Sequence, residues 1–582
     1  DSAFANVPEL RDSGFSRERY RRLIDLAGSV AGFPRHLSTH LGGIVVTREP
    51  LLDITPVQMA AKGFPVIQFD KVDVEDLGLV KLDLLCLRIL SAVQDTVASV
   101  RQRDASFDYD NIPYDDKASY DLIAASDTIG VFQLESPAQK SLHTRLQPDR
   151  FEDLIAAVAI IRPGPILANM VDPYIARRHG QQPVTYLHPS LEKILSKTYG
   201  VVLFQEQVIE IATEIAGFTP GESDKLRRAM TSNRSYAEMD RIGEHFIERA
   251  VEKGVKRRIA EEIFSYIRAY AGYGFCEAHA AAFADTSYKT AYLKQHHAAH
   301  FYAALLSNQP MGYYPPHTLI WEAKRKGIEV RPPDINASDR KYKVEGEAMR
   351  VGLEQVRNAG EASLPKLIEA RNANGAFASL HDFCRRARVD RDTTRDLILA
   401  GAFDAMNSNR RQLLWELAAI GDMNDDTPRL DICTSTEPMN VPDFSPNEKW
   451  WHEMDVLGLS LHKHPMEFTR EDLRERGVIT CEEAREAPTG KRVKVAGMIL
   501  RPHRPPTKSG RTVVFFSLED ETEILEVTVF ESVYNRCGRA IFTQPLLTVA
   551  GHIDRRGAPG TMGSLTASHV EGWTFDPAAK AG

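Results

Sequence analysis

The spacing of apolar residues changes along this chain of 582 residues, and the change excludes a fold built around one core. From about residue 91 to 310, apolar residues recur with a helical period, as in 90–102, 151–161, 205–216, 257–271 and 282–306. Between 490 and 575 short runs alternate apolar and polar residues, which is typical of half-buried strands. Because single cores rarely grow beyond about 250–300 residues, we expect a multidomain α+β protein.

These patterns divide the chain into consecutive stretches. Residues 1–35 are predicted to be helical, and 36–90 mix turns with β-rich runs at 43–47 and 66–69. After the helical region we expect the following stretches: a Pro-rich connector at 311–345, helical hairpins at 346–421, a linker with connecting helices at 422–489, strands at 490–575 and a tail at 576–582. Five strands with a helix at 531–540 between the third and fourth favour a small OB-type barrel.

The charge balance excludes a protein coated in basic residues. The formal net charge is −8 and the pI is about 6.2, so nucleic-acid contacts must come from local basic patches and weaken with salt. Six cysteines lie far apart without a CxxC pair, which argues for reduced thiols and a cytoplasmic location. No stretch of transmembrane length and no signal peptide is visible, so we expect no membrane partner.

One carboxylate stands out in the apolar run GLVKLDLLCLRIL, residues 78–90. Because burying an unpaired carboxylate is costly, we expect Asp83 to lie at the edge of a site. Lys81 shares its face on a strand, since it lies two residues earlier. The pair suits a metal-bound polyphosphate, with Asp83 as the metal ligand and Lys81 at the phosphates. A surface salt bridge on an edge strand is the alternative.

Further candidates lie in glycine-bent turns and at a helix start. Candidate substrate or DNA contacts in the turns are His40, Arg162, Tyr273 and His279. Arg227 and Arg228 follow a predicted helix start, where guanidinium groups suit triphosphate binding. For the two arginines, the alternative is a solvated helix face. For the turn at His40, the alternative is that its hydroxyl groups only satisfy local backbone donors.

Two segments have the character of DNA-binding elements. The turn at Asn358 and Gly360 fits a helix-hairpin-helix, whose backbone amides contact DNA phosphates, and 380–402 would complete a tandem unit. A plain helical hairpin is the alternative. In the predicted barrel, the basic side chains expected to bind single strands are Arg501, Arg504, Lys508 and Arg511. Phe515 and Phe516 follow, and only one of them can serve as a stacking platform, because the other must face the core.

Read together, these segments resemble the C-family bacterial DNA polymerases, the DNA polymerase III alpha subunit and its relatives. The likeness runs from about residue 30 to the end. It rests on the ordered motifs RHLSTHLGGIVV, GLVKLDLLCLRIL, TIGVFQLES, RPGP, YGVVLFQEQV, AGFTPGESDKLRRAM and YGFCEAHAAAF. Within the family, IIRPGPI, the segment 308–314 and FFSLEDET resemble the error-prone, damage-tolerance branch.

The resemblance implies a domain for each stretch. These are the end of a thumb-like region (1–35), the C-terminal part of a nucleotidyltransferase-type palm (36–90), large helical fingers (91–310), tandem helix-hairpin-helix elements (346–421) and an OB-type barrel (490–575). It also implies transfer of nucleotides from dNTPs to a primer 3′ end in damage-induced mutagenesis and translesion repair synthesis. Two Mg²⁺ ions are expected, with Asp83 as a metal-binding carboxylate, Lys81 at the phosphates and Arg227 and Arg228 at the triphosphate.

The implied partners are primer-template DNA, dNTPs and single-stranded DNA. Other damage-tolerance proteins, and the sliding clamp through such partners, are further expected contacts. The family's first two metal carboxylates form an Asp-x-Asp pair that we do not find before Asp83. We therefore expect an N-terminally truncated polymerase that does not polymerise alone. A non-catalytic DNA-binding scaffold and a replicative alpha subunit are the alternatives.

Overall fold

The structure is a computed structural model that describes residues 6–14, 17–36, 38–161, 170–231, 236–270, 275–420, 441–505, 507, 510–555 and 563–573. The part of the chain up to residue 83 builds little core. Its elements are α2 (Pro8–Arg11), α3 (Arg17–Ser29), β1 (Gly43–Val46), η1 (Leu51–Asp53), β2 (Val57–Met59), β3 (Pro65–Ile67), α4 (Lys71–Asp76) and β4 (Val80–Asp83). β1 pairs antiparallel with β4, and β2 pairs with β3, as two separate two-stranded sheets.

Large apolar side chains remain exposed around these strands. Leu41 is 94% exposed, Leu52 75% and Leu85 66%. Exposed apolar surface of this extent marks an interaction surface rather than a finished fold. The apolar run that surrounds Asp83 is therefore not a buried strand among the described residues.

The helical region follows the predicted period closely. Its elements are α5 (Arg88–Arg101), α6 (Lys117–Ala124), α7 (Pro137–Leu146), α8 (Phe151–Ile160), α10 (Val171–Arg178), η2 (Pro189–Leu191), α11 (Glu192–Leu195), η3 (Ser196–Thr198), α12 (Gln205–Ala216), α13 (Pro220–Thr231), α14 (Tyr236–Glu252) and α15 (Arg257–Tyr270). The predicted helix at 205–216 is confirmed as α12, which ends at Gly217 in the left-handed conformation that glycine favours. The helices α11 to α15 enclose a core of their own, with Ile211, Phe246 and Ile263 buried in it.

Three central helices differ from the predicted pattern. They are α16 (Glu277–His296), α17 (Ala298–Ser307) and α18 (Pro316–Arg325). The single helix predicted at 282–306 is broken at His297. The Pro-rich connector contains α18, most of which is buried. Its prolines are compatible with a helix, because Pro316 occupies the first helical position, where the missing N–H costs nothing.

The next segment forms a small sheet and a helical unit. Its elements are β5 (Val330–Arg331), β6 (Lys343–Glu345), β7 (Ala348–Arg350), η4 (Leu353–Gln355), α19 (Leu364–Asn374), α20 (Leu380–Ala387), α21 (Arg391–Leu399) and α22 (Arg410–Ile420). The strands pair in the order β5-β7-β6. The predicted helical pair at 380–402 is present as α20 and α21, whereas the first arm of the predicted hairpin is only the single turn η4.

The C-terminal segment contains connecting helices and a five-stranded barrel. Its elements are α23 (Pro446–Leu457), η5 (Pro465–Phe468), α24 (Arg470–Glu475), α25 (Cys481–Glu486), β8 (Arg492–His503), β9 (Val513–Glu519), β10 (Ile524–Phe530), α26 (Glu531–Thr543), β11 (Leu546–Asp554) and β12 (Ser564–Trp573). The strands close in the order β10-β12-β11-β8-β9. As predicted, one helix lies between the third and fourth strands, and most of the expected linker at 422–446 lies outside the described residues.

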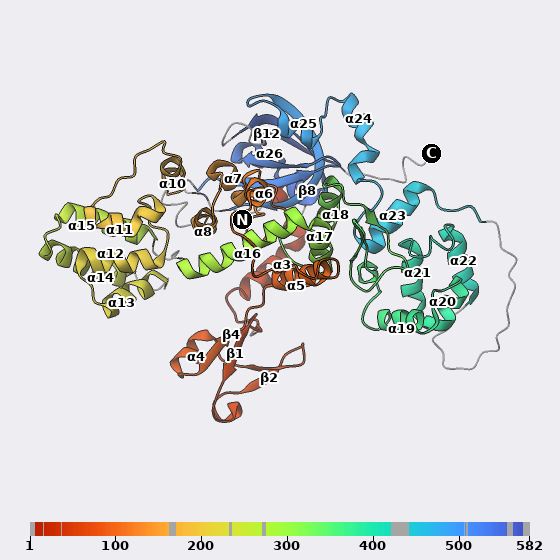
Figure 1. Cartoon of the computed structure of the whole chain (residues 1–582), viewed down its shortest axis with the longest axis horizontal. Coiled ribbons are helices and arrows are strands. Elements are labelled where there is room, and N and C mark those ends of the chain that lie inside the picture. Colours follow the sequence, from red (N-terminus) through yellow and green to blue (C-terminus); the bar gives the residue numbers. More distant parts are fainter. Residues whose placement is uncertain are drawn as a thin grey trace.

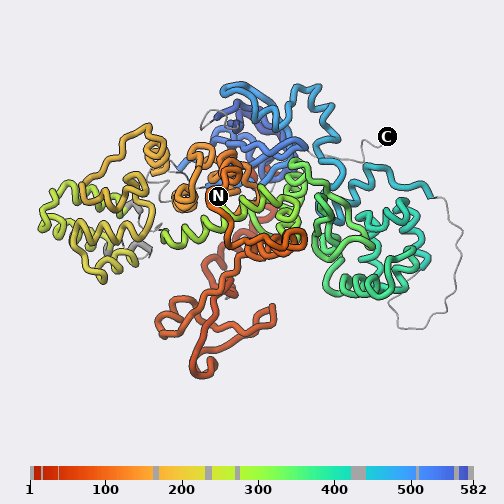
Figure 2. Tube along the Cα trace, in the orientation of Figure 1, coloured from red at the N-terminus to blue at the C-terminus, as the bar shows by residue number. Residues whose placement is uncertain are grey.

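A chain of buried charges joins the central helices to the barrel. Lys294 of α16 donates to Asp127 at 2.8 Å and to Glu322 of α18 at 3.3 Å. One turn further along α18, Arg325 lies 3.0 Å from Glu519 of β9, whose side chain is fully buried. Figure 1 and Figure 2 show the result: the barrel lies above α16 to α18, the α11–α15 unit and the α19–α22 unit lie on opposite sides, and the β1/β4 ribbon projects below.

The two adjacent phenylalanines of β9 allow a matched test of the barrel core. Phe516 is fully buried, whereas Phe515 is half-buried on the opposite face. We expect Phe516→Ala to destabilise the barrel by about 3–5 kcal/mol, because it leaves a cavity. The measurement is hydrogen exchange of the β10 and β11 amides in the whole chain. Phe515→Ala is the control, and equal protection in the two variants would contradict this assignment of faces.

Candidate functional site

Three of the sequence-predicted residues meet on the β1/β4 ribbon. The register pairs Gly43 with Asp83 and Val45 with Lys81. The Lys81 ammonium donates to Asp83 Oδ1 at 2.6 Å. His40 folds back over the start of β1, because its Nδ1 accepts from the backbone N–H of Gly42 at 3.1 Å and of Gly43 at 2.5 Å. The ribbon therefore places an imidazole, an ammonium and a carboxylate side by side.

The close approach at this point depends on a missing side chain. A Cβ on Gly43 would lie 2.8 Å from His40 Nδ1 and 2.8 Å from Lys81 Cε, so glycine is required if both groups are to stay in place. The Asp83 side chain is 51% exposed. The hydrogen bond from Lys81 lowers the pKa of Asp83, and the nearby His40 adds a smaller effect in the same direction. Asp83 is thus an exposed, ionised carboxylate.

Within the described part of the chain, Asp83 belongs to no group of three or more potential metal ligands. Among the described residues, the one cluster of three potential metal ligands is His317, His464 and Glu519, which lies elsewhere. Asp83 does not line the cavity described below either. The described ribbon supplies one carboxylate to a metal site and no more.

Arg227 and Arg228 lie in another part of the molecule. Both are on α13, and both bind Asp224, at 2.9 Å and 2.8 Å respectively. Figure 1 places α13 in the α11–α15 unit, well apart from β4. The structure therefore does not bring these arginines to Asp83.

A cavity of about 570 Å³ brings together residues from the helical region and the barrel. The predicted contact His279 lines it from the first turn of α16, where its ring lies 4.2 Å from that of Phe283. Arg501 of β8, predicted to bind single strands, also lines the cavity, with its guanidinium 4.8 Å above the Tyr313 ring. Aromatic faces and guanidinium groups in one cavity suit a nucleobase.

A buried carboxyl group organises the wall of this cavity. Glu135 accepts hydrogen bonds from the backbone N–H groups of Gly130 and Tyr313. A Cβ on Gly312 would lie 2.9 Å from Glu135 Oε1, so this tight turn requires a glycine. Burial raises the pKa of Glu135. Sequence reasoning used TIGVFQLES as a motif but did not single out Glu135, since nothing local predicts that residues 310–314 pack on it.

The predicted hairpin uses its polar groups internally. The Asn358 side chain donates to Asp396 at 2.9 Å, and the Gly360 N–H donates to the Ser363 hydroxyl at 3.1 Å. Asn358 itself is exposed and has a φ of +65°. A DNA phosphate at this turn would have to replace Ser363 as the acceptor for the Gly360 N–H.

The remaining barrel residues fall into different environments. Arg504 packs against the Tyr534 and Phe542 rings and pairs with Glu9 of the N-terminal segment at 3.3 Å, while its side chain stays exposed. Arg511 is exposed, and Phe515, whose ring does not face the core, is half-buried and pairs with His503 across the strands. Arg162, Tyr273 and Lys508 lie outside the described residues.

Comparisons with known proteins match three parts of the chain. Residues 1–86 match the model of the bacterial DNA polymerase III alpha NTPase domain, 87–254 the alpha subunit finger domain, and 327–413 a helix-hairpin-helix motif. The chain is therefore similar to the bacterial DNA polymerase III alpha subunit over these domains. In the described parts of the chain, no helix is long and apolar enough to cross a membrane.

Several relatives carry the name error-prone DNA polymerase. The one from Symbiobacterium thermophilum is 49% identical over 96% of this chain and 55% of its own length. Those from Anaeromyxobacter dehalogenans and Mycolicibacterium paratuberculosis are 40% and 39% identical, over 93% and 91% of the chain and 49% of their own lengths. The chain thus spans about half the length of the curated relatives that it matches.

The Lys81–Asp83 contact has a direct titration test. Because the Lys81 hydrogen bond lowers the pKa of Asp83, we expect Lys81→Met to raise that pKa toward the ordinary value of about 3.9. The measurement is a ¹³C-carboxyl titration, with Asp83→Asn to assign the resonance. Lys71→Met, on α4, is the control and should leave the pKa of Asp83 unchanged. An Asp83 pKa that stays the same in Lys81→Met would show that the contact has no effect on the ionisation of Asp83.

Proposed function

We propose that the natural protein carrying this chain is a DNA-directed DNA polymerase that adds dNTPs to a primer 3′ end during error-prone, damage-induced synthesis. The observation that carries the proposal is the meeting of His40, Lys81 and Asp83 on one ribbon. The similarity to the alpha subunit supports this chemistry, and the names of the relatives support the error-prone branch. The substrates are then primer-template DNA and dNTPs.

In this proposal Asp83 holds a divalent cation and Lys81 meets the phosphates. Mg²⁺ is commonly bound through one or two carboxylates together with substrate phosphates, and one exposed carboxylate fits one ligand position. When bound, two Mg²⁺ ions would neutralise the triphosphate charge and assist attack by the primer hydroxyl. Lys81 already keeps Asp83 ionised, and a phosphate oxygen can replace Asp83 as its partner. The further carboxylates of a two-ion site are assigned to the part of the relatives that this chain does not span.

The other segments take the roles that the family suggests. Residues 1–35 belong to a thumb-like region, 36–90 to the palm and 91–310 to the fingers, while 346–421 are the tandem helix-hairpin-helix and 490–575 the OB-type barrel. Arg227 and Arg228 are proposed to meet the triphosphate by exchanging Asp224 for phosphate oxygens. Since the described structure keeps α13 away from β4, this role requires the fingers to move toward the palm.

The decisive test is Asp83→Asn in the natural full-length polypeptide. Primer extension should fall by orders of magnitude, because the metal loses a charged ligand, while primer-template affinity stays within about twofold. Primer extension and gel-shift binding measure the two quantities, and Asp76→Asn on α4 is the matched control.

Equal loss of binding and extension in Asp83→Asn would give Asp83 a structural role. Binding without extension in the unaltered natural polypeptide would favour the scaffold alternative. Robust Asp83-dependent extension by residues 1–582 alone would contradict the argument that one carboxylate is insufficient.

The barrel is proposed to bind single-stranded DNA through Phe515 and Arg511. Phe515→Leu keeps an apolar side chain but removes the stacking face, so single-strand affinity should fall by about tenfold. Arg511→Ala should instead lower the slope of log affinity against log salt by about one. Fluorescence anisotropy with a labelled oligonucleotide at several salt concentrations measures both effects. Arg476→Ala, outside the barrel, is the control. Unchanged binding in both test variants would contradict single-strand binding and favour a protein-docking role for the barrel.

A further inference from the structure

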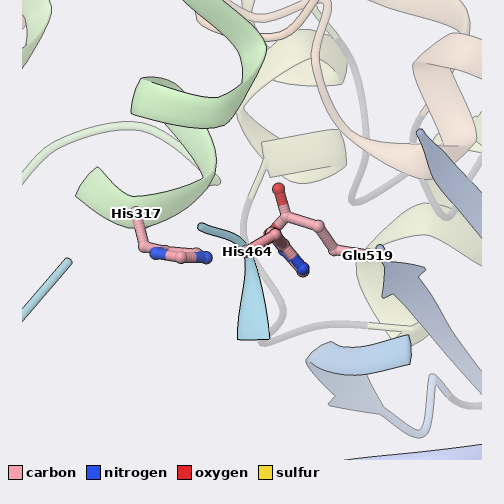
Figure 3. A group of neighbouring side chains, drawn as sticks. All are labelled: His317, His464 and Glu519. Carbon is pink, nitrogen blue, oxygen red and sulfur yellow. The ribbon is translucent and has the colours of Figure 1, made fainter. Parts of the chain in front are cut away.

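A second cluster of metal-ligand type lies far from the ribbon and has no part in the proposed polymerase chemistry. His317 comes from the first turn of α18, His464 precedes η5, and Glu519 ends β9. Their potential ligand atoms all lie within 4.8 Å of one another, and all three residues are buried. Figure 3 shows the three side chains turned toward one another from separate elements.

The two imidazoles carry buried nitrogen atoms that no described group satisfies. His317 Nδ1 accepts from the Ser460 N–H at 3.4 Å, and His464 Nδ1 accepts from the Met466 N–H at 3.2 Å. In each ring the Nε2 atom is fully buried and, among the described residues, has no hydrogen-bond partner. A buried polar atom without a partner costs roughly 1–3 kcal/mol. Two such atoms beside one carboxylate are groups that a bound cation would satisfy.

The carboxylate is oriented as a metal ligand would be. Glu519 Oε2 accepts from the Thr318 hydroxyl at 2.7 Å, and Oε1 accepts from Arg325 at 3.0 Å. Since a carboxylate offers about four lone-pair positions, two hydrogen bonds leave capacity for an ion. In metal sites, the ligating side chains are regularly oriented by hydrogen bonds from neighbouring groups.

We infer that His317, His464 and Glu519 form a zinc site. Two imidazoles and one carboxylate make a donor set that Zn²⁺ accepts with tetrahedral geometry, leaving a fourth position for water. Bond lengths of about 2.0–2.1 Å require ligand atoms roughly 3.3 Å apart, so the cluster contracts on binding. The proton of each ring then moves from Nε2 to Nδ1, and the hydrogen bonds from the Ser460 and Met466 N–H groups are given up. The ion joins α18, the segment before η5 and the barrel in one place.

The test is the metal content and zinc affinity of the whole chain. After purification without chelator, elemental analysis should find one zinc ion per chain, and calorimetry with the apo protein and ZnCl₂ should show one site. His317→Ala and His464→Ala should each abolish that site. Thr318→Val should weaken it by about 10- to 100-fold, because Glu519 loses the group that orients it.

The chain offers a matched control in His143, which is also buried, with both ring nitrogens unpartnered among the described residues, but which belongs to no ligand cluster. His143→Ala should retain the zinc ion. If the His317 and His464 variants fail to fold, the unaltered protein is loaded with Co²⁺ instead. An absorption spectrum typical of tetrahedral Co²⁺, which disappears when zinc is added, supports the site. Absence of zinc and of that absorption, or equal zinc retention in His317→Ala and His464→Ala, would overturn it.

Discussion

The arrangement of the domains depends on a row of buried charges that passes from Asp127 through Lys294, Glu322 and Arg325 to Glu519. Taking charges out of water is expensive, and the cost is recovered only where every member is paired. Lys294 makes four contacts, with Asp127, Glu322 and two backbone carbonyl groups. Since loss of one member would leave another charge unpaired, the row holds the barrel and the helical region in one relative position.

The consequence for function is that the barrel contributes one basic side chain to the central cavity. Arg501 reaches over Tyr313 and His279 comes from α16, so the lining includes residues of both the barrel and the helices. A strand of DNA that entered it would contact both units at once. By contrast, the β1/β4 ribbon projects with its apolar side chains exposed. The rigid part of the structure is therefore the junction of helices and barrel, and the proposed chemistry lies on the part with the least support around it.

Local sequence signals predicted individual elements well. The helical period placed α12, and alternation placed the strands of the barrel and showed that one of Phe515 and Phe516 must be buried. The pairing of Lys81 with Asp83 followed from their two-residue spacing. Local signals failed where packing overrode them. Residues 311–345 looked like a connector because of their prolines, yet α18 is one of the most buried helices.

The amino-acid sequence by itself determined the kind of most elements, the likeness to a polymerase family and the face that Lys81 and Asp83 share, because these depend on neighbours in the chain. Only the tertiary structure decided that His317, His464 and Glu519 meet, that Glu135 supports the turn at Gly312, and that Arg504 pairs with Glu9. Such contacts join residues that are remote in sequence. They result from the combined packing of many elements, which no local pattern of residues records.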